Sequence, residues 1–220
     1  MHAETNGEGS LTARTRTLKA MRSALAGIPI VSTDWIRVCG EQNKAMEPSP
    51  SMYVRSLPTK TDSLQATKAA SHGVSLVAAD LHRFTNPKLA LPLSKMSVYL
   101  CGNFSQNKRN DIQIIAKESG GKVLSSLSAV TEKLKSLLTN ANSNSRVILI
   151  CDDSSSNCIP NALEKDIRAA LDHDKTCVMV VSPTWLFDTV SCGSALPATS
   201  HEPFAPRAKE LWKLASESDR

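Results

Sequence analysis

The amino-acid sequence predicts an α/β protein made of two similar units, each a small parallel sheet flanked by helices, joined by a partly helical linker. The first observation is an internal repeat, because the pattern of residues 30–39 recurs at residues 180–189. Each copy is a short apolar strand, then helix-starting residues, then a Trp in the first helical turn. A second observation is that residues 146–151 and 176–181 are mainly apolar, which is typical of parallel strands buried on both faces. Together these patterns indicate two copies of one domain.

Length and composition are consistent with two globular domains. A chain of 220 residues can form two ordinary domains, each with its own core. Hydrophobic residues make up 41% of the chain and charged residues 21%, which are values of globular proteins. The formal charge is +5, with a modest basic excess near the N-terminus. This charge is too small for a dedicated nucleic-acid binder, but it favours a local anionic ligand.

The cysteines and the hydropathy pattern indicate which cellular compartment we expect for the protein. The six cysteines form no Cys-x-x-Cys pair, so we expect reduced and mostly buried thiols in an intracellular protein. No apolar run reaches the ~18 residues that a membrane helix needs, and no signal-peptide pattern begins the chain. We therefore expect no membrane partner.

Local signals predict the N-terminal elements. Residues 1–11 are polar and rich in glycine, which indicates a loop, with a strand remnant as an option at residues 1–3. Residues 15–26 are predicted to form a helix, because apolar side chains recur on one face. A strand is expected over residues 28–31, although Pro29 argues against a central position in a sheet. The helix that carries Trp35 follows.

The second unit is predicted to be complete. Its strands are expected at residues 95–101, 122–124, 146–151 and 176–181, and its helices at residues 108–119, 161–171 and 183–192, with a short helical insertion at 131–138. This alternation predicts a small parallel sheet with helices on both sides. The predicted divisions of the chain are a partial first unit (residues 1–55), a linker (56–94), a complete second unit (95–197) and a C-terminal helix (198–220).

Two glycines and two tryptophans carry a resemblance to a known family. Gly120 and Gly121 lie between the first helix and the second strand of the second unit, and Trp185 lies in its last helix. This arrangement resembles a BRCT domain, and the duplication of the Trp pattern at Trp35 makes the chain similar to a BRCT tandem. The resemblance implies two BRCT-like units in which these four residues are structural core positions.

The first unit matches the BRCT pattern only from the second helix onward. Counterparts of the family's first strand, first helix and second strand are lacking, so we expect either a shortened piece of a longer protein or a gene model that starts too late. A sheet without these strands exposes apolar edges and helix faces. The first unit is therefore predicted to be poorly stable and prone to aggregation.

The main candidate site is the basic helix start Thr15-Arg16-Thr17-Leu18-Lys19. A helix N-terminus offers unpaired N–H groups and a partial positive charge. Lys19 adds a full charge and Thr17 can donate a hydroxyl hydrogen bond, so the two favour a phosphate. The Arg16 guanidinium suits peptide carbonyls or a carboxylate of the second unit. The resemblance implies that Lys19 binds the phosphate and that Arg16 contacts the peptide main chain; the alternative is a solvated basic helix face.

Three functions remain open at this point. The resemblance implies an adaptor that binds phosphoserine or phosphothreonine peptides of a phosphorylated protein partner. It also allows a DNA-binding module, which the low total charge disfavours, or a phosphate-independent interaction scaffold. It also implies a nuclear setting, in the DNA-damage response, a checkpoint or chromosome segregation at the kinetochore. The C-terminal part of a kinetoplastid kinetochore protein is one host that the resemblance suggests.

Catalytic and metal-binding patterns are not evident in the sequence. Asp152 and Asp153 follow a buried strand, but no third acid or His falls at a credible position for a metal, so a strand-end turn is expected. The sequence holds no phosphate-binding loop of the Walker type and no Gly-x-Ser-x-Gly elbow. We therefore expect a monomeric, non-enzymatic protein without a cofactor or a metal.

Overall fold

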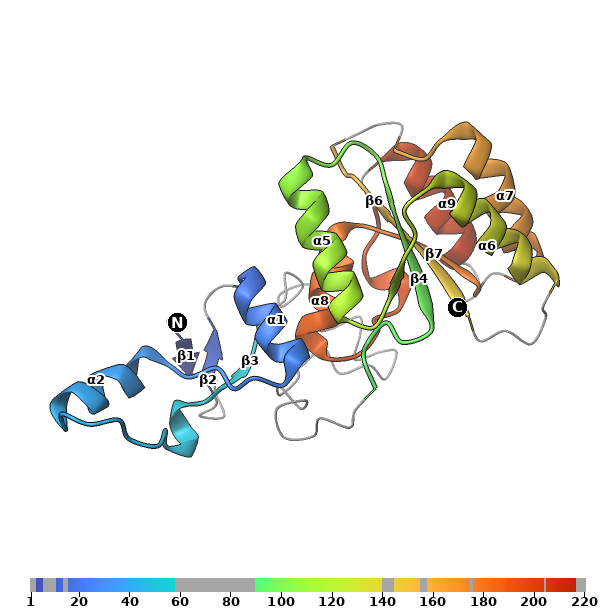
Figure 1. Cartoon of the computed structure of the whole chain (residues 1–220). Helices are drawn as coiled ribbons and strands as arrows, with labels where there is room; N and C mark the ends of the chain where they lie inside the picture. The colour runs from blue at the N-terminus through green and yellow to red at the C-terminus, as the bar shows by residue number, and fades with distance from the viewer. Residues whose placement is uncertain are drawn as a thin grey trace. The chain divides into compact units, whose positions relative to one another are not determined.

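The computed structural model describes residues 3–5, 11–13, 16–57, 90–139, 145–154, 158–174, 176–203 and 205–216. The chain forms two compact units, whose elements are labelled in Figure 1. The first unit comprises residues 1–92 with 187–195, and the second comprises residues 93–186 with 196–220. Most of the predicted linker lies outside the described residues, so its helical content stays a prediction.

The second unit is built on a four-stranded parallel sheet. Its strands, in the spatial order β5-β4-β6-β7, are β4 (Met96–Cys101), β5 (Lys122–Val123), β6 (Arg146–Cys151) and β7 (Val178–Val181). Each of them falls within a segment that the sequence predicts to be a strand. The predicted α/β class with a small parallel sheet is confirmed.

Helices cover both faces of this sheet. They are α5 (Gln106–Glu118), α6 (Leu127–Thr139), α7 (Asn161–His173), α8 (Pro183–Cys192) and α9 (Pro206–Ser216), with a 3-10 turn η2 (Ala198–Ser200). Helices α6, α7 and α9 lie on one face of the sheet, and α5 and the start of α8 lie on the other (Figure 1). The short insertion predicted at residues 131–138 is a full helix of 13 residues, α6, because Val130, Leu134 and Leu137 share its buried face.

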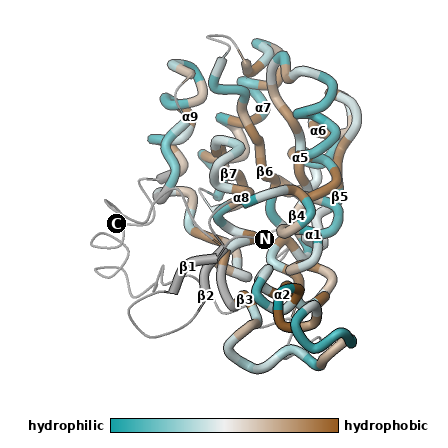
Figure 2. Tube along the Cα trace, turned by 90° about the vertical axis from the view of Figure 1, so that its left-hand side faces the viewer, coloured by the Kyte–Doolittle hydropathy of each residue, from teal (hydrophilic) through white to brown (hydrophobic). Residues whose placement is uncertain are grey.

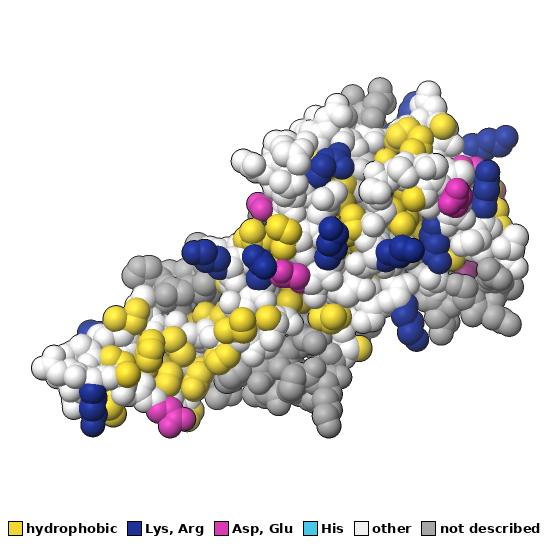
Figure 3. Space-filling model, viewed as in Figure 1, with side chains coloured by type: hydrophobic (Ala, Val, Ile, Leu, Met, Phe, Trp, Pro, Cys, Tyr) yellow, Lys and Arg dark blue, Asp and Glu magenta, His cyan; other side chains and the backbone are white. Residues whose placement is uncertain are grey.

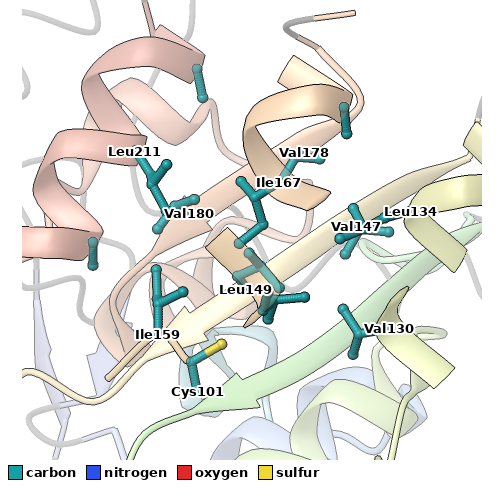
Figure 4. Packing of buried hydrophobic residues seen from close by; sticks show 14 of the residues in the cluster. Cys101, Val130, Leu134, Val147, Leu149, Ile159, Ile167, Val178, Val180 and Leu211 are labelled. Atoms are coloured by element: carbon teal, nitrogen blue, oxygen red, sulfur yellow. The ribbon is translucent and has the colours of Figure 1, made fainter. Parts of the chain in front are cut away.

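Strand β6 lies at the centre of the hydrophobic core. All its residues from Val147 to Cys151 are buried, and hydrophobic colour follows this strand in Figure 2. In Figure 4, Leu149 of β6 and Val180 of β7 lie in one cluster with Ile167 of α7 and Leu211 of α9. Full burial of such a side chain contributes about 1.5–3 kcal/mol, so this cluster is a main source of the stability of the second unit.

The two repeated tryptophans make the same local hydrogen bond. The indole N–H of Trp185 donates to the carbonyl of Leu196 at 3.0 Å, and that of Trp35 donates to the carbonyl of Met46 at 2.7 Å, each eleven residues further on. Their burial differs, however. Trp185 is 0% exposed, whereas Trp35 is only partly buried and its helix has no buried residue. The expectation that Trp35 is a core position is therefore wrong, because its ring is only partly buried.

The pair Gly120-Gly121 serves two different geometric needs. Gly120 adopts a left-handed φ of 87° directly after α5, a conformation that costs other residues free energy. A Cβ at Gly121 would lie 3.0 Å from the carbonyl oxygen of Ala116 and 3.1 Å from Cγ2 of Val98. The predicted structural role of both glycines thus has a physical basis, because one turns the chain and the other lets the backbone pack closely.

The first unit contains a three-stranded sheet and two helices. Its elements are β1 (Ala3–Thr5), β2 (Leu11–Ala13), α1 (Leu18–Ala26), α2 (Thr33–Glu41), a 3-10 turn η1 (Pro50–Met52) and β3 (Val54–Ser56). Strand β1 pairs antiparallel with β2, and β2 pairs parallel with β3. This sheet is therefore mixed, whereas the sequence predicts a parallel one.

Two predictions for the first unit are wrong. The loop predicted over residues 1–11 contains β1 and the start of β2, because pairing with the distant β3 supplies backbone partners that local sequence cannot reveal. The strand predicted over residues 28–31 does not form, and only Val31 makes an isolated bridge, to Tyr53. Pro29 has no N–H to donate to a ladder, so the segment cannot pair regularly.

Hydrophobic side chains gather on the surface of the first unit (Figure 3). Ile28 and Ile36 are 56% and 63% exposed, and Met46 is 36% exposed. Exposed apolar surface on this unit agrees with the expectation from the sequence. Such a surface favours association with other apolar surfaces.

We expect Trp185→Ala to destabilise its unit by about 3–5 kcal/mol, because a completely buried ring is replaced by a cavity. Trp35→Ala removes a partly exposed ring that makes the same indole hydrogen bond, so its cost should be clearly smaller. Native-state hydrogen exchange of each unit measures both free energies of unfolding. Equal losses for the two variants would contradict the difference in burial.

We expect Gly121→Ala to destabilise the second unit by about 1–3 kcal/mol, because the added methyl group overpacks a site bounded by a helix carbonyl. Gly40→Ala is the matched control, since no atom lies within 4 Å of a Cβ placed there and alanine favours the helix by roughly 0.5–1 kcal/mol. Chemical denaturation of both variants checks this. A neutral Gly121→Ala would show that the neighbouring atoms move aside at little cost.

Candidate functional site

The start of α1 is closed by a side-chain cap. Thr17 has extended backbone angles (φ −85°, ψ 157°), and its Oγ1 accepts a hydrogen bond from the N–H of Ala20 at 3.2 Å. The helix therefore begins at Leu18, three residues later than the sequence predicts. The hydroxyl proton of Thr17 is not used by this bond, so Thr17 can cap the helix and still donate to an anion.

Lys19 occupies the first turn of the same helix. Its side chain is exposed, while Ala20, Met21, Ala24 and Leu25 form the buried face of α1. The N–H groups of the first turn have no acceptors within the helix, and the first turn of α1 contains no acidic residue. The structure thus brings Thr17 and Lys19 together at one positive helix end.

Arg16 is held by a carboxylate. Its Nη1 donates to Oδ1 of Asp188 in α8 and lies 3.4 Å from Oγ of Ser191, while the guanidinium carbon lies 5.6 Å from the centre of the Phe187 ring. The side chains of Arg16 and Asp188 are 10% and 0% exposed. A carboxylate is one of the two partners that we expect for Arg16 from the sequence.

These contacts give the three candidate residues different positions. Thr17 and Lys19 are exposed and share the helix end, whereas Arg16 is mostly buried against α8. A buried ion pair costs desolvation of both charges, which good geometry and added hydrogen bonds offset. The Arg16–Asp188 pair therefore fixes where α1 begins, next to the two exposed groups.

Asp188 is the residue that the sequence analysis missed. It lies far from Arg16 in sequence and shares no motif with it, so no local pattern could pair them. One signal was present, since Asp188 is the single charged residue of α8. A carboxylate in a helix without any other charged residue indicates a buried partner.

The start of α7 is the corresponding helix end of the second unit, and it differs in charge. Pro160 is its N-cap and makes no side-chain cap bond, and Glu164 lies in its first turn. Glu164 is paired with Arg168, with an Nη2–Oε1 distance of 2.9 Å. Arg207 also lies 3.6 Å from this carboxylate, so the acid of α7 is paired with two arginines, whereas the first turn of α1 has no acid. The expectation that the phosphate site lies on the first unit stays a prediction.

Asp152 forms the turn that the sequence predicts. Its Oδ1 accepts a hydrogen bond from the N–H of Ser154 at 3.2 Å and lies 3.9 Å from Nζ of Lys108. Among the residues that the structure describes, no three His, Cys, Asp or Glu side chains are placed to hold a metal ion. The helices in the described ranges are all too short or too polar to cross a bilayer.

Comparisons with known proteins agree with this architecture. The family model described as "BRCT domain" matches residues 84–202. No curated protein matches the chain. The crystal structure of the Brc1 BRCT5-BRCT6 domains of S. pombe is similar with a TM-score of 0.56 and 20% sequence identity, over 86% of this chain and 80% of that one. At this identity the likeness concerns the fold alone.

We expect Asp188→Ala to destabilise the first unit by about 3–5 kcal/mol, because it leaves the buried Arg16 charge without its carboxylate. The double variant Arg16→Met/Asp188→Leu should be less destabilised than Asp188→Ala, since neither charge remains buried. Hydrogen exchange of the α1 amides measures both free energies. A cost below about 1 kcal/mol for Asp188→Ala would mean that the pair is exposed to water in solution.

Proposed function

The chain belongs to the BRCT domain family, and we propose that it is an adaptor module that binds phosphoserine or phosphothreonine peptides of a partner protein. BRCT domains are typically non-enzymatic modules of protein interaction and commonly bind phosphorylated proteins. In this proposal the phosphate binds to Lys19 and Thr17. The peptide main chain binds beside Arg16.

The observation that carries the proposal is the exposed positive end of α1. A phosphate dianion placed there can accept a hydrogen bond from the Thr17 hydroxyl and lies at the positive end of the helix dipole. Lys19 supplies a full charge to the same oxygens, and charge-assisted bonds of this kind are about twice as strong as neutral ones. An unphosphorylated hydroxyl offers no such charge, so binding should depend on phosphorylation.

Arg16 fits the proposal in two ways. Its pairing with Asp188 holds the residue before the cap in place, which orients the end of α1. A guanidinium also has five N–H donors, so an ion pair with one carboxylate is compatible with a further bond to a peptide carbonyl. We propose this main-chain contact as the second anchor of the peptide.

The biological setting follows from the family. We propose a nuclear role in a process governed by phosphorylation, such as the DNA-damage response, a checkpoint or chromosome segregation. DNA binding is the competing function, because Lys19 could equally neutralise a backbone phosphate. Binding to DNA would weaken steeply with salt and would not require a phosphorylated residue.

The test is retention of a degenerate phosphoserine and phosphothreonine peptide library on the chain, with a phosphatase-treated library as control. Peptides that are retained are then titrated by fluorescence anisotropy against Lys19→Glu. We expect this variant to lose at least about ten-fold in affinity, since a repulsive charge replaces an attractive one. Its melting temperature should change by only a few degrees, because Lys19 is exposed.

Lys165→Glu is the matched control, because Lys165 is an exposed lysine near the start of α7. It should bind phosphopeptides as the unchanged chain does. Equal loss in both variants would indicate a general effect of net charge, and unchanged binding by Lys19→Glu would exclude the α1 site. Salt-sensitive retention of DNA without selection of phosphopeptides would favour the competing function.

A further inference from the structure

Three cysteine side chains meet at the carboxyl ends of β4 and β6. Cys101 and Cys151 are the final residues of these strands and are paired in register. Cys158 follows the turn after β6 and belongs to the same buried cluster. The three residues are 1%, 0% and 2% exposed. Figure 4 labels Cys101, which lies next to Ile159.

Two of these cysteines line a polar pocket. It has a volume of about 290 Å³ and is lined by Cys101, Cys158, Gly102, Asn103 and Arg109, among others. Arg109 Nη2 donates to the carbonyl of Gly102 at 3.0 Å, which places a cation at the pocket wall. The pocket therefore lies directly beside Cys158, although this residue is only 2% exposed.

The backbone at Gly102 sets the position of Cys158. A Cβ at Gly102 would lie 3.1 Å from Cβ of Cys158 and 2.7 Å from Cβ of Asp152, and its φ is +106°. Only a residue without a side chain allows this approach. The close packing keeps Cys158 beside Gly102 and Asp152, the residues that directly follow Cys101 and Cys151.

The thiols differ in acidity. A hydrogen bond from the Cys151 thiol lowers the pKa of Cys158, although burial and nearby carboxylates oppose the shift. Hydrogen bonds with Cys101 and Cys158 raise the pKa of Cys151 well above its usual value. Cys177, which is buried alone in the same unit, has its pKa raised to about 11, chiefly by burial. Cys158 thus has more thiolate character than Cys177, and the thiolate is the reactive form.

We propose that Cys158 and Cys151 are a modification site at which a hydroperoxide forms a reversible disulfide. The Cys158 thiolate attacks the O–O bond of hydrogen peroxide, so that a sulfenic acid forms and hydroxide leaves, which takes up a proton as water. The Cys151 sulfur then attacks the sulfenic sulfur; the S–S bond forms, the S–O bond breaks, and the leaving hydroxide takes the Cys151 proton as a second water. Two thiols lose two electrons in total, and one peroxide gains them.

Cys151 is the resolving thiol rather than Cys101 for a geometric reason. Side chains of paired residues on adjacent strands stand roughly parallel, at about the strand spacing of ~4.8 Å. A disulfide needs Cβ atoms about 3.5–4.5 Å apart, so a Cys101–Cys151 bond would pull the sheet together. Cys158 lies outside the strands, so a bond from it to Cys151 leaves the pairing of β4 with β6 intact.

The test treats the reduced chain with hydrogen peroxide in a Cys39→Ser/Cys192→Ser background, which removes the two less buried thiols. Remaining thiols are alkylated, and the products are analysed by intact mass and peptide mapping. We expect the loss of two hydrogens and a Cys151–Cys158 link that dithiothreitol reverses. Cys158→Ser and Cys158→Ala cannot form this link, and we expect neither variant to lose two hydrogens on treatment with peroxide.

Cys177→Ser is the matched control, because this buried cysteine lies in the same core but outside the thiol group. It should leave the yield unchanged, and so should Cys101→Ser. Thermal melting confirms that each variant is folded. A Cys101–Cys151 link, oxidation of Cys177 as fast as that of Cys158, or no internal disulfide in the folded chain would overturn the proposal.

Discussion

Burial of β6 on both faces is the constraint on which the second unit depends. Its backbone groups cannot reach water, so they must pair along the full length of β4 and along β7. Its side chains point alternately to the two faces, and because Val147 to Cys151 are all buried, each face needs its own layer of helices. Parallel strands also require long crossovers, and α5, α6 and α7 supply both the crossovers and the cover.

This constraint explains which parts of the fold could be predicted. Strands β6 and β7 were evident from their apolar runs, and the Trp185 helix from its start signals, because all of these depend on local composition. The strand predicted at residues 28–31 failed because Pro29 removes a donor that a paired strand needs. Strand β2 was not predicted, since three residues gain a strand conformation only through pairing with β1 and β3.

The candidate phosphate site and the thiol group also differ in how much of each the local sequence can reveal. Thr17 and Lys19 could be found from sequence, because a helix start is a local feature. The Asp188 partner of Arg16 could not, since the pairing spans 172 positions. The thiol group was equally hidden: Cys101 and Cys151 meet only because β4 and β6 pair in one particular register. The sequence predicted that most cysteines are buried. Which of them lie together depends on the pairing of the strands in the sheet.

The repeat also shows what a shared motif leaves open. Trp35 and Trp185 make the same indole hydrogen bond at the same spacing, so the motif determines local geometry in both units. Their burial differs because burial depends on what packs around the motif. Helices α1 and α7 differ in the same manner, since both precede a Trp helix but only α7 has an acid in its first turn. Correspondence within a repeat therefore does not determine the charges at a helix end, and these charges favour or oppose an anion there.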